Sequence, residues 1–258
     1  MPGNIKLVVC DVDGTLLQKS ENELSADAVS AINELTDCKA VFVAASGRSV
    51  ASLEKIFDKV KKKAFIGSDG AVFKGTCGRI LYQKAIPTES LERILPKLKC
   101  DFVLYTQDAA YVRGDAIYNS VCDAENGRVK SFNEFCFDIP VLKLALYRGG
   151  DEYGARYAEA NNLVRCCYSD AVWREYVSPS VNKGAALEFI QGSFGFKYEE
   201  TAVFGDNIND VEMLKNAYYS YAVGGARQEI KTLARFCAGS AAEEIKKITE
   251  NLRKAVLK

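Results

Sequence analysis

The chain contains no histidine among its 258 residues. This absence excludes several classes of site at once: enzymes that form a phosphohistidine, hydrolases with a Ser-His-Asp triad, and zinc sites with histidine ligands. Any acid or base catalysis must therefore use carboxylates, lysine, tyrosine or cysteine.

The chain also lacks net charge, because 34 basic residues balance 34 acidic ones. No overall field attracts nucleic acid or an anionic membrane, so an anionic ligand must be held by a few local groups. The longest early apolar run, Leu7 to Cys10, is far too short to span a bilayer. We expect no transmembrane segment and no nucleic-acid or membrane partner, and no feature implies a protein partner.

The nine cysteines are odd in number, include no Cys-x-x-Cys pair, and follow no N-terminal segment that resembles a signal peptide. Disulfides persist mainly in oxidising compartments, where such a segment would have directed the chain. We therefore predict a reducing, cytoplasmic location.

Apolar runs and helical patterns alternate along much of the chain, whose 48% hydrophobic content can build a substantial core. Runs without polar alternation indicate strands buried on both faces, as in a parallel sheet. Four such runs occur, at residues 5–10, 40–45, 64–66 and 201–204. Helical spacing follows the first two, for example at Val29, Ile32 and Leu35. The pattern predicts an α/β fold with a doubly wound, mostly parallel, Rossmann-like core sheet.

The middle of the chain has a different pattern, in which short alternating or aromatic-rich segments are separated by Gly, Asp and Asn. These segments span residues 102–105, 110–113, 141–147 and 172–177. We interpret them as a separate α+β unit with a partly antiparallel sheet. Pro87 and the stretch 178–180, Ser-Pro-Ser, mark its expected boundaries.

Paired aspartates follow two of the predicted buried strands. Asp11 and Asp13 end the first, within Asp-Val-Asp-Gly-Thr, and Asp206 and Asp210 follow Phe204 within Gly-Asp-Asn-Ile-Asn-Asp. Ligands bind at the carboxyl ends of strands in open α/β sheets. If the two strands are neighbours, four aspartates converge on one crevice.

Such crowding of carboxylates predicts a divalent cation. Two like charges about 4 Å apart repel by roughly 4 kcal/mol at an effective dielectric near 20. Oxygen ligands without nearby histidine or cysteine suit Mg²⁺. Calcium fits less well, because an EF-hand loop needs glycine at its sixth position and glutamate at its twelfth, whereas Gly14 is fourth from Asp11 and Asn22 is twelfth.

Two further polar residues precede or begin predicted helices. Ser46 follows the strand at 40–45 and could offer its hydroxyl and nearby amides to a phosphate, while Lys183 could neutralise the phosphate charge. Taken alone, Ser46 is more often a helix cap, and Lys183 more often a solvated lysine. Together with the aspartates they predict a phosphoryl-transfer site.

These motifs resemble those of the haloacid dehalogenase superfamily, specifically the Cof-like phosphatases with a type IIB (C2) cap. The resemblance spans essentially the whole chain and is carried by four segments in the family's order. They are Asp11 to Thr15, Ala45 to Arg48, Asn182 to Gly184, and Gly205 to Asp210.

The resemblance implies a catalytic role for each aspartate. Asp11 would attack phosphorus to form an aspartyl-phosphate, and Asp13 would protonate the leaving oxygen and then activate water. On its reference pKa of about 3.9, Asp11 should be ionised. Mg²⁺ would be bound by the Asp11 carboxylate, the Asp13 carbonyl and Asp206, with Asp210 in support.

The resemblance also implies which residues bind substrate. Ser46, Lys183 and Asn209 would hold the transferring phosphate, with Gly47 and Arg48 beside it. Residues 1–82 and 181–258 would form the catalytic core, and residues 83–180 an α+β cap that excludes water and sets specificity.

The chain departs from the family pattern at two positions. Where many relatives have Asn-Gly-Ala after the third strand, this chain has Asp69-Gly70-Ala71, which adds a negative charge on the leaving group's side. The glycine common before the lysine motif is replaced by Ser180. Inference about the substrate by analogy is therefore weakened.

We predict a Mg²⁺-dependent phosphomonoesterase acting on a small phosphorylated metabolite such as a sugar phosphate. Three alternatives stay open: a hexose phosphomutase of the same superfamily, a non-catalytic phospho-acceptor such as a receiver domain, and a silent metabolite-binding protein. The spacing from Cys122 to Arg128 matches cysteine phosphatases, but Asp123 and Glu125 between them would repel phosphate.

Overall fold

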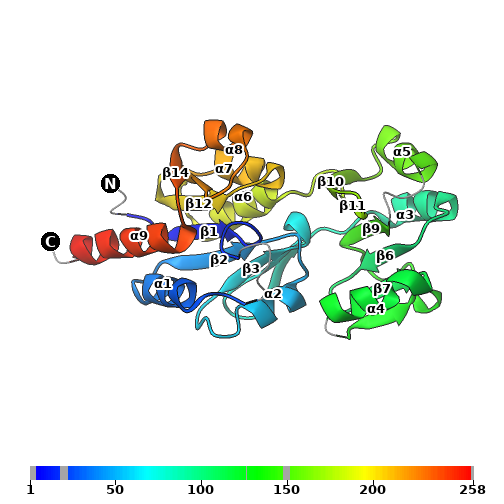
Figure 1. Ribbon diagram of the computed structural model, residues 1–258, viewed down its shortest axis with the longest axis horizontal. Helices are drawn as coiled ribbons and strands as arrows, with labels where there is room; N and C mark the ends of the chain where they lie inside the picture. Colours follow the sequence, from blue (N-terminus) through cyan, green and yellow to red (C-terminus); the bar gives the residue numbers. More distant parts are fainter. Residues whose placement is uncertain (1–3, 18–22, 126, 148–151, 257–258) are drawn as a thin grey trace.

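The computed structural model describes residues 4–17, 23–125, 127–147 and 152–256. Its strands form two separate sheets, one in each of two lobes placed end to end (Figure 1). The chain leaves the first lobe after β5 (Ile80–Gln83) and returns to it before α6 (Lys183–Phe194). The second lobe is therefore inserted into the first.

The first lobe is built on a sheet of eight strands within the described residues. The strands besides β5 are β1 (Leu7–Asp11), β2 (Val41–Ala45), β3 (Ala64–Gly67), β4 (Val72–Lys74), β12 (Thr201–Gly205), β13 (Tyr219–Val223) and β14 (Phe236–Ala238). Their order is β14-β13-β12-β1-β2-β3-β4-β5. Neighbours from β14 to β3 are parallel, and the β4-β5 hairpin joins antiparallel.

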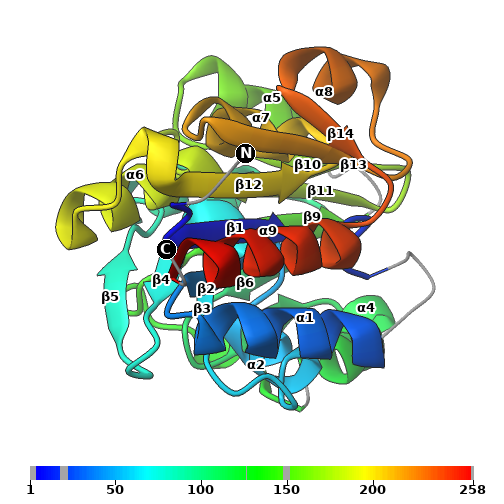
Figure 2. The same ribbon diagram turned by 90° about the vertical axis from the view of Figure 1, so that its left-hand side faces the viewer.

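Helices cover both faces of this sheet. One face packs on α1 (Ala26–Asp37), α2 (Val50–Ile56) and α9 (Ala241–Val256), and the other on α6, α7 (Val211–Lys215) and α8 (Gln228–Leu233). Figure 2 shows α1 and α9 beside one another over β1 and β2. Successive residues of β1 point to opposite clusters, Val8 to the first and Leu7 and Val9 to the second. The unbroken apolar runs therefore arise because both faces are buried.

The second lobe has a mostly antiparallel sheet of order β10-β11-β9-β6-β7-β8. Its strands are β6 (Phe102–Tyr105), β7 (Ala110–Arg113), β8 (Val129–Ser131), β9 (Lys143–Tyr147), β10 (Arg165–Ser169) and β11 (Trp173–Val177). Helices α3 (Thr88–Ile94) and α5 (Glu152–Ala160) pack with one face, and α4 (Asp115–Ala124) with part of the other. Alternate strand residues enter the two clusters, as Val103 and Leu104 do.

Five short 3₁₀ helices complete the described part of the chain. They are η1 (Ser68–Gly70), η2 (Leu95–Lys97), η3 (Phe132–Glu134), η4 (Tyr198–Glu200) and η5 (Ile208–Asp210). Two of them carry polar residues discussed below: η1 directly follows core strand β3, and η5 follows core strand β12 after the two residues Asp206 and Asn207. In the part of the chain that is described, no helix has both the length and the apolar composition needed to cross a bilayer.

The predicted fold class is confirmed, down to the strands at 102–105 and 110–113. The prediction missed β4, β5, β13 and β14 in the core. The β4-β5 hairpin lies at the contact between the two lobes, because Ala71 and Val72 at its start pack against Leu142, Val177 and Val181. The extent of the cap, residues 83–180, stays a prediction.

Candidate functional site

The site lies where the carboxyl ends of neighbouring strands meet. Strand β1 pairs in parallel with both β2 and β12, so residues that end or follow these strands come together at one edge of the sheet. Asp11 ends β1, Ser46 follows β2, and Asp206 follows β12. The sequence separates these residues widely, and the strand order brings them together, as expected at a switch in an α/β sheet.

Lys183 lies at the centre of the buried charges. It is the first residue of α6, whose N-terminus is capped by the Asn182 side chain accepting from the Ala185 amide at 2.7 Å. The ammonium is fully buried and donates to Asp11 Oδ1 at 2.5 Å and to Asp210 Oδ1 at 2.7 Å. Its predicted place at a helix start is confirmed, and it joins two of the predicted aspartates.

Three carboxylates lie around this one ammonium group, which donates to two of them. Oxygens of Asp11, Asp206 and Asp210 lie within 4.8 Å of one another. Burial and the Asp210 carboxylate raise the pKa of Asp11 well above its ordinary value, and the same two causes raise the pKa of Asp206. Burial alone would lower the pKa of Lys183, but Asp11 and Asp210 outweigh it and raise that pKa. The reference pKa used in the sequence analysis therefore does not show that Asp11 is ionised. Its ionisation depends on positive charge beside it.

Backbone and hydroxyl donors fix the other two carboxylates. Asp210 Oδ2 accepts from the amides of Asp206 and Asn207 at 3.0 and 3.1 Å, and the Thr15 hydroxyl donates to Asp206 Oδ1 at 3.1 Å. Gly205 permits the close turn, because a Cβ there would lie 2.7 Å from the Asp210 Cβ. These contacts leave Asp11 Oδ2 as a buried oxygen with no hydrogen-bond partner.

Asp13 points away from that cluster toward Arg48. The guanidinium Nη2 donates to Asp13 Oδ1 at 2.7 Å and Nε to Oδ2 at 3.0 Å, a bidentate contact. The Ser46 hydroxyl donates to Asp13 Oδ2 at 3.2 Å and accepts from the Arg48 amide at 3.1 Å. Three predicted site residues are thus in direct contact, with Asp13 and Arg48 partly exposed to the cavity.

Asn209 and Gly47 both contact Asp69, which follows β3 in η1. Asn209 Nδ2 donates to Asp69 Oδ1 at 3.2 Å, and a Cβ on Gly47 would lie 2.9 Å from Asp69 Oδ2. Asp69 has a left-handed backbone, φ 57°, and its side chain is buried. Asp69, noticed only as a departure from the family pattern, therefore lies beside the predicted phosphate residues.

A cavity of about 380 Å³ lies between the lobes and joins these residues to the cap. Its cap side includes Tyr105, Lys143 and Glu175, from one face of the cap sheet: Tyr105 pairs with Lys143, and Glu175 with Ala145. Buried Lys143 donates to Glu175 Oε2 at 2.7 Å and to the Gly47 carbonyl of the core at 2.8 Å. Glu125, at the end of α4, makes a second contact with the core: its carboxylate accepts from the Ser49 hydroxyl at 2.7 Å.

Sequence reasoning missed these cap residues. A usable signal existed, because Lys143 is the single charge in the otherwise apolar segment 141–147, and such a residue in a buried strand needs a partner. The Cys-x5-Arg alternative finds no support, because Cys122 lies inside helix α4 and does not follow a strand.

The comparison with protein families agrees with the strand-end motifs. Residues 8–244 match the family model of the haloacid dehalogenase-like hydrolases. The chain belongs to this family. A relative from Bacillus subtilis named phosphatase YwpJ is 27% identical, over 89% of this chain and 93% of its own. The HMP-PP phosphatase of Klebsiella pneumoniae is 25% identical, over 88% and 86% of the two chains.

Solved structures of this family share the arrangement of core and inserted lobe. A crystal structure from Eubacterium rectale aligns with a TM-score of 0.81 at 25% identity, over 98% of this chain and all of that one. The predicted membership among the Cof-like enzymes of the haloacid dehalogenase superfamily is confirmed, as is the predicted enzyme class, a phosphatase.

Proposed function

We propose that the chain is a Mg²⁺-dependent phosphomonoesterase that forms an aspartyl-phosphate on Asp11. The observation that carries the proposal is the convergence of Asp11, Lys183 and Asp210 in one buried contact, with Asp206 within 4.8 Å. Among these groups the Asp11 Oδ2 atom has no partner, so it is available to a cation or to a phosphorus atom.

The residues present fit a magnesium ion. Three carboxylates and one ammonium leave the cluster short of positive charge, and all its ligand atoms are oxygens, which Mg²⁺ prefers. Asp11, Asp206 and the Asp13 carbonyl would hold the ion, with Asp210 fixed behind them by two backbone amides. Bound there, Mg²⁺ would neutralise phosphate charge and keep Asp11 ionised.

The side chains then divide the two steps of the reaction. Asp11 attacks phosphorus while Asp13, at the open cavity, donates a proton to the leaving oxygen. For this step Asp13 must first take up a proton and give up one of its two contacts with Arg48. In the second step Asp13 takes a proton from the attacking water, and phosphate leaves Asp11. Ser46, Gly47, Arg48, Asn209 and Lys183 are the proposed phosphate and substrate contacts, and Lys183 also holds Asp11 in place.

The cavity supports a small metabolite as the substrate. Its volume of about 380 Å³ lies at the small end of the range of roughly 300–1,000 Å³ typical of ligand pockets. A monosaccharide phosphate is our proposed class of substrate. None of the nine cysteines, all of which lie within the described residues, forms a disulfide, which supports the proposed reducing, cytoplasmic compartment.

The experiment compares wild type and Asp11→Asn with p-nitrophenyl phosphate and a panel of sugar phosphates, in Mg²⁺ and after EDTA. We expect phosphate release by the wild type, loss in EDTA, recovery with Mg²⁺, and less than a few per cent activity in Asp11→Asn. Phosphate must appear without any bisphosphate activator, since a phosphomutase would need one. Appreciable turnover by a folded Asp11→Asn would contradict the nucleophile assignment.

A further inference from the structure

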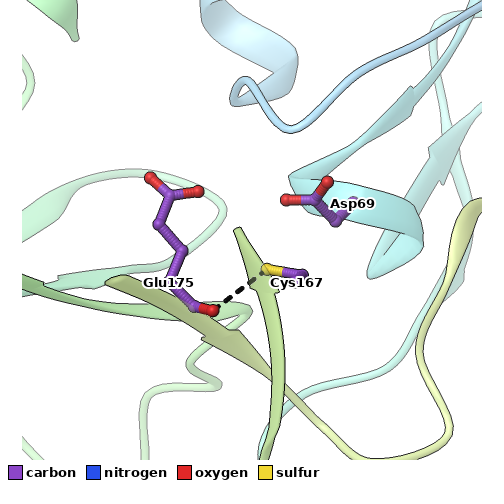
Figure 3. A group of neighbouring side chains, drawn as sticks. All are labelled: Asp69, Cys167 and Glu175. Atoms are coloured by element: carbon purple, nitrogen blue, oxygen red, sulfur yellow. Dashed lines mark hydrogen bonds between the residues drawn. The ribbon is translucent and has the colours of Figure 1, made fainter. Parts of the chain in front are cut away.

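Part of the cavity lining is unusually acidic for an enzyme that binds an anion. Asp69, Glu125 and Glu175 line it, and they come from core η1, the end of α4 and cap strand β11. Figure 3 shows the Asp69 and Glu175 carboxylates on either side of a common space. Asp69 is 2% exposed, and its Oδ2 has no hydrogen-bond partner.

The cations that line the cavity do not balance these carboxylates. Arg48 is engaged by Asp13 in a bidentate contact. Lys143 donates to Glu175 and to the Gly47 carbonyl. Asp69 and Glu125 accept from neutral groups, the Asn209 amide and the Ser49 hydroxyl. A ligand that brings positive charge and N–H donors would offset this excess.

We infer that the substrate's leaving group carries a primary ammonium group, bound between Asp69 and Glu175. The inference rests on the proposed function and specifies its substrate class as phosphate monoesters of amino alcohols or amino sugars. An ammonium that donates to two oxygens at about 2.8 Å and a tetrahedral angle sets those oxygens about 4.6 Å apart. One oxygen of Asp69 and one of Glu175 lie no more than 4.8 Å apart, an upper limit that allows that span.

The ammonium site adjoins the phosphate site closely. The Asp69 amide donates to the Ser46 carbonyl at 3.1 Å, and the Asp69 carboxylate contacts Asn209 and packs on Gly47. The amino group therefore lies within about six bonds of the ester oxygen, as in 2-aminoethyl phosphate or glucosamine 6-phosphate.

Cys167 completes this cluster and raises the alternative of a metal ion. Its thiol donates to the Glu175 carbonyl at 3.4 Å, and burial raises the pKa of that thiol (Figure 3). A metal would need the thiolate, whereas the raised pKa favours the protonated thiol. An organic ammonium does not need that change, so the structure favours it.

Asp69→Asn is a suitable variant because it removes the charge and keeps the shape. Asparagine tolerates the left-handed backbone at this position, and its carbonyl oxygen can still accept from Asn209. Asp27→Asn, which removes an exposed carboxylate paired with Lys246, is the matched control.

The test measures kcat/KM for two substrate pairs, 2-aminoethyl against 2-hydroxyethyl phosphate and glucosamine 6-phosphate against glucose 6-phosphate. We expect the kcat/KM of the wild type to favour the amine in at least one pair by tenfold or more. This is about the effect of one hydrogen bond to a charged group. Asp69→Asn should lower that ratio by about 10- to 100-fold, and Asp27→Asn should leave it unchanged.

Each outcome decides a separate point. If p-nitrophenyl phosphate is not hydrolysed by the wild type, the proposed function fails and this inference with it. If it is hydrolysed but the hydroxyl compounds are equal or better in both pairs, the ammonium site alone is overturned. Tight Zn²⁺ binding that Cys167→Ser abolishes would also overturn it, because the carboxylates would then serve a metal.

Discussion

Replacing Lys183 with methionine tests the buried charge cluster directly. The ammonium is fully buried and donates to Asp11 and Asp210, whose side chains are 7% and 0% exposed. Methionine fills a similar volume but leaves both carboxylates without their cation. Removing one partner of a buried ion pair costs about 3–5 kcal/mol, so we expect Lys183→Met to lose that much free energy of unfolding.

The loss should be large in a thermal melt and should depend on pH. For a chain of this size about 2–4 °C is lost per kcal/mol, which gives a fall in Tm of roughly 6–20 °C. A carboxyl group whose folded pKa is raised destabilises the fold as pH rises above its unfolded pKa. Burial and the Asp210 carboxylate already raise the pKa of Asp11. Without Lys183 this effect grows, so the variant should approach wild-type stability as the pH falls toward 5.

The measurement is unfolding followed by circular dichroism in EDTA, at pH 5 and pH 8. Lys246→Met is the control, because its ion pair with Asp27 is exposed and such pairs contribute about 1 kcal/mol or less. If Lys183→Met lost no more stability than Lys246→Met at pH 8, the three carboxylates would not need this cation and the reasoning would fail.

Two further predictions concern the acid and the packing of α6. Asp13→Asn should slow turnover more for alkyl phosphates than for p-nitrophenyl phosphate, because a poor leaving group needs the proton; an equal loss for both in a steady-state assay would argue against its acid role. Gly184→Ala should destabilise the fold by about 1–3 kcal/mol, because its Cβ would lie 2.6 Å from Glu212. Gly192→Ala in the same helix is the control: its Cβ would meet no atom within 4 Å, so it should stabilise the fold by up to about 1 kcal/mol. Thermal melts that rank the two variants alike would refute this prediction.

The core could be predicted from the sequence because its signals are local. Buried parallel strands produce unbroken apolar runs, and each polar motif follows such a run, so the strand ends at Asp11, Ser46 and Asp206 were located before the strand order was known. Whether these strands are neighbours was left open by the sequence, and the order with β1 between β2 and β12 comes from the pairing.

The short core strands were harder to predict. Strand β14 has three residues, two of them exposed, and β5 alternates between half-buried and exposed positions. Their apolar runs, at residues 236–238 and 80–82, are short and at least partly exposed, and both strands are positioned by neighbouring strands. Tertiary contacts outweigh local preference at such sheet edges.

The cap residues that line the cavity could not be assigned to one site because no fixed spacing marks them, although the charge of Lys143 in an apolar segment was a usable signal. Lys143, Glu175 and Glu125 come from β9, β11 and the end of α4, and they meet only when the cap sheet forms. Asp69 differs from them, since it follows a core strand and was noticed as an unusual charge. Glu175, which lies near it in the structure, is more than a hundred residues away in the sequence. The sequence therefore showed the charge of Asp69 but not the group of carboxylates to which it belongs.

The two lobes contribute unequally to the chemistry we propose. Core side chains are fixed by strand ends, buried amides and Lys183, whereas the cap reaches the core pocket through Lys143 on the Gly47 carbonyl and Glu125 on the Ser49 hydroxyl. These polar contacts, the Arg165–Glu212 ion pair and the apolar contact of Ala71 and Val72 with the cap would have to break for the lobes to part. Gly47 and Ser49 flank Arg48, which holds Asp13. Closure of the cap therefore bears on the segment that positions the proposed acid, which links substrate enclosure to proton transfer.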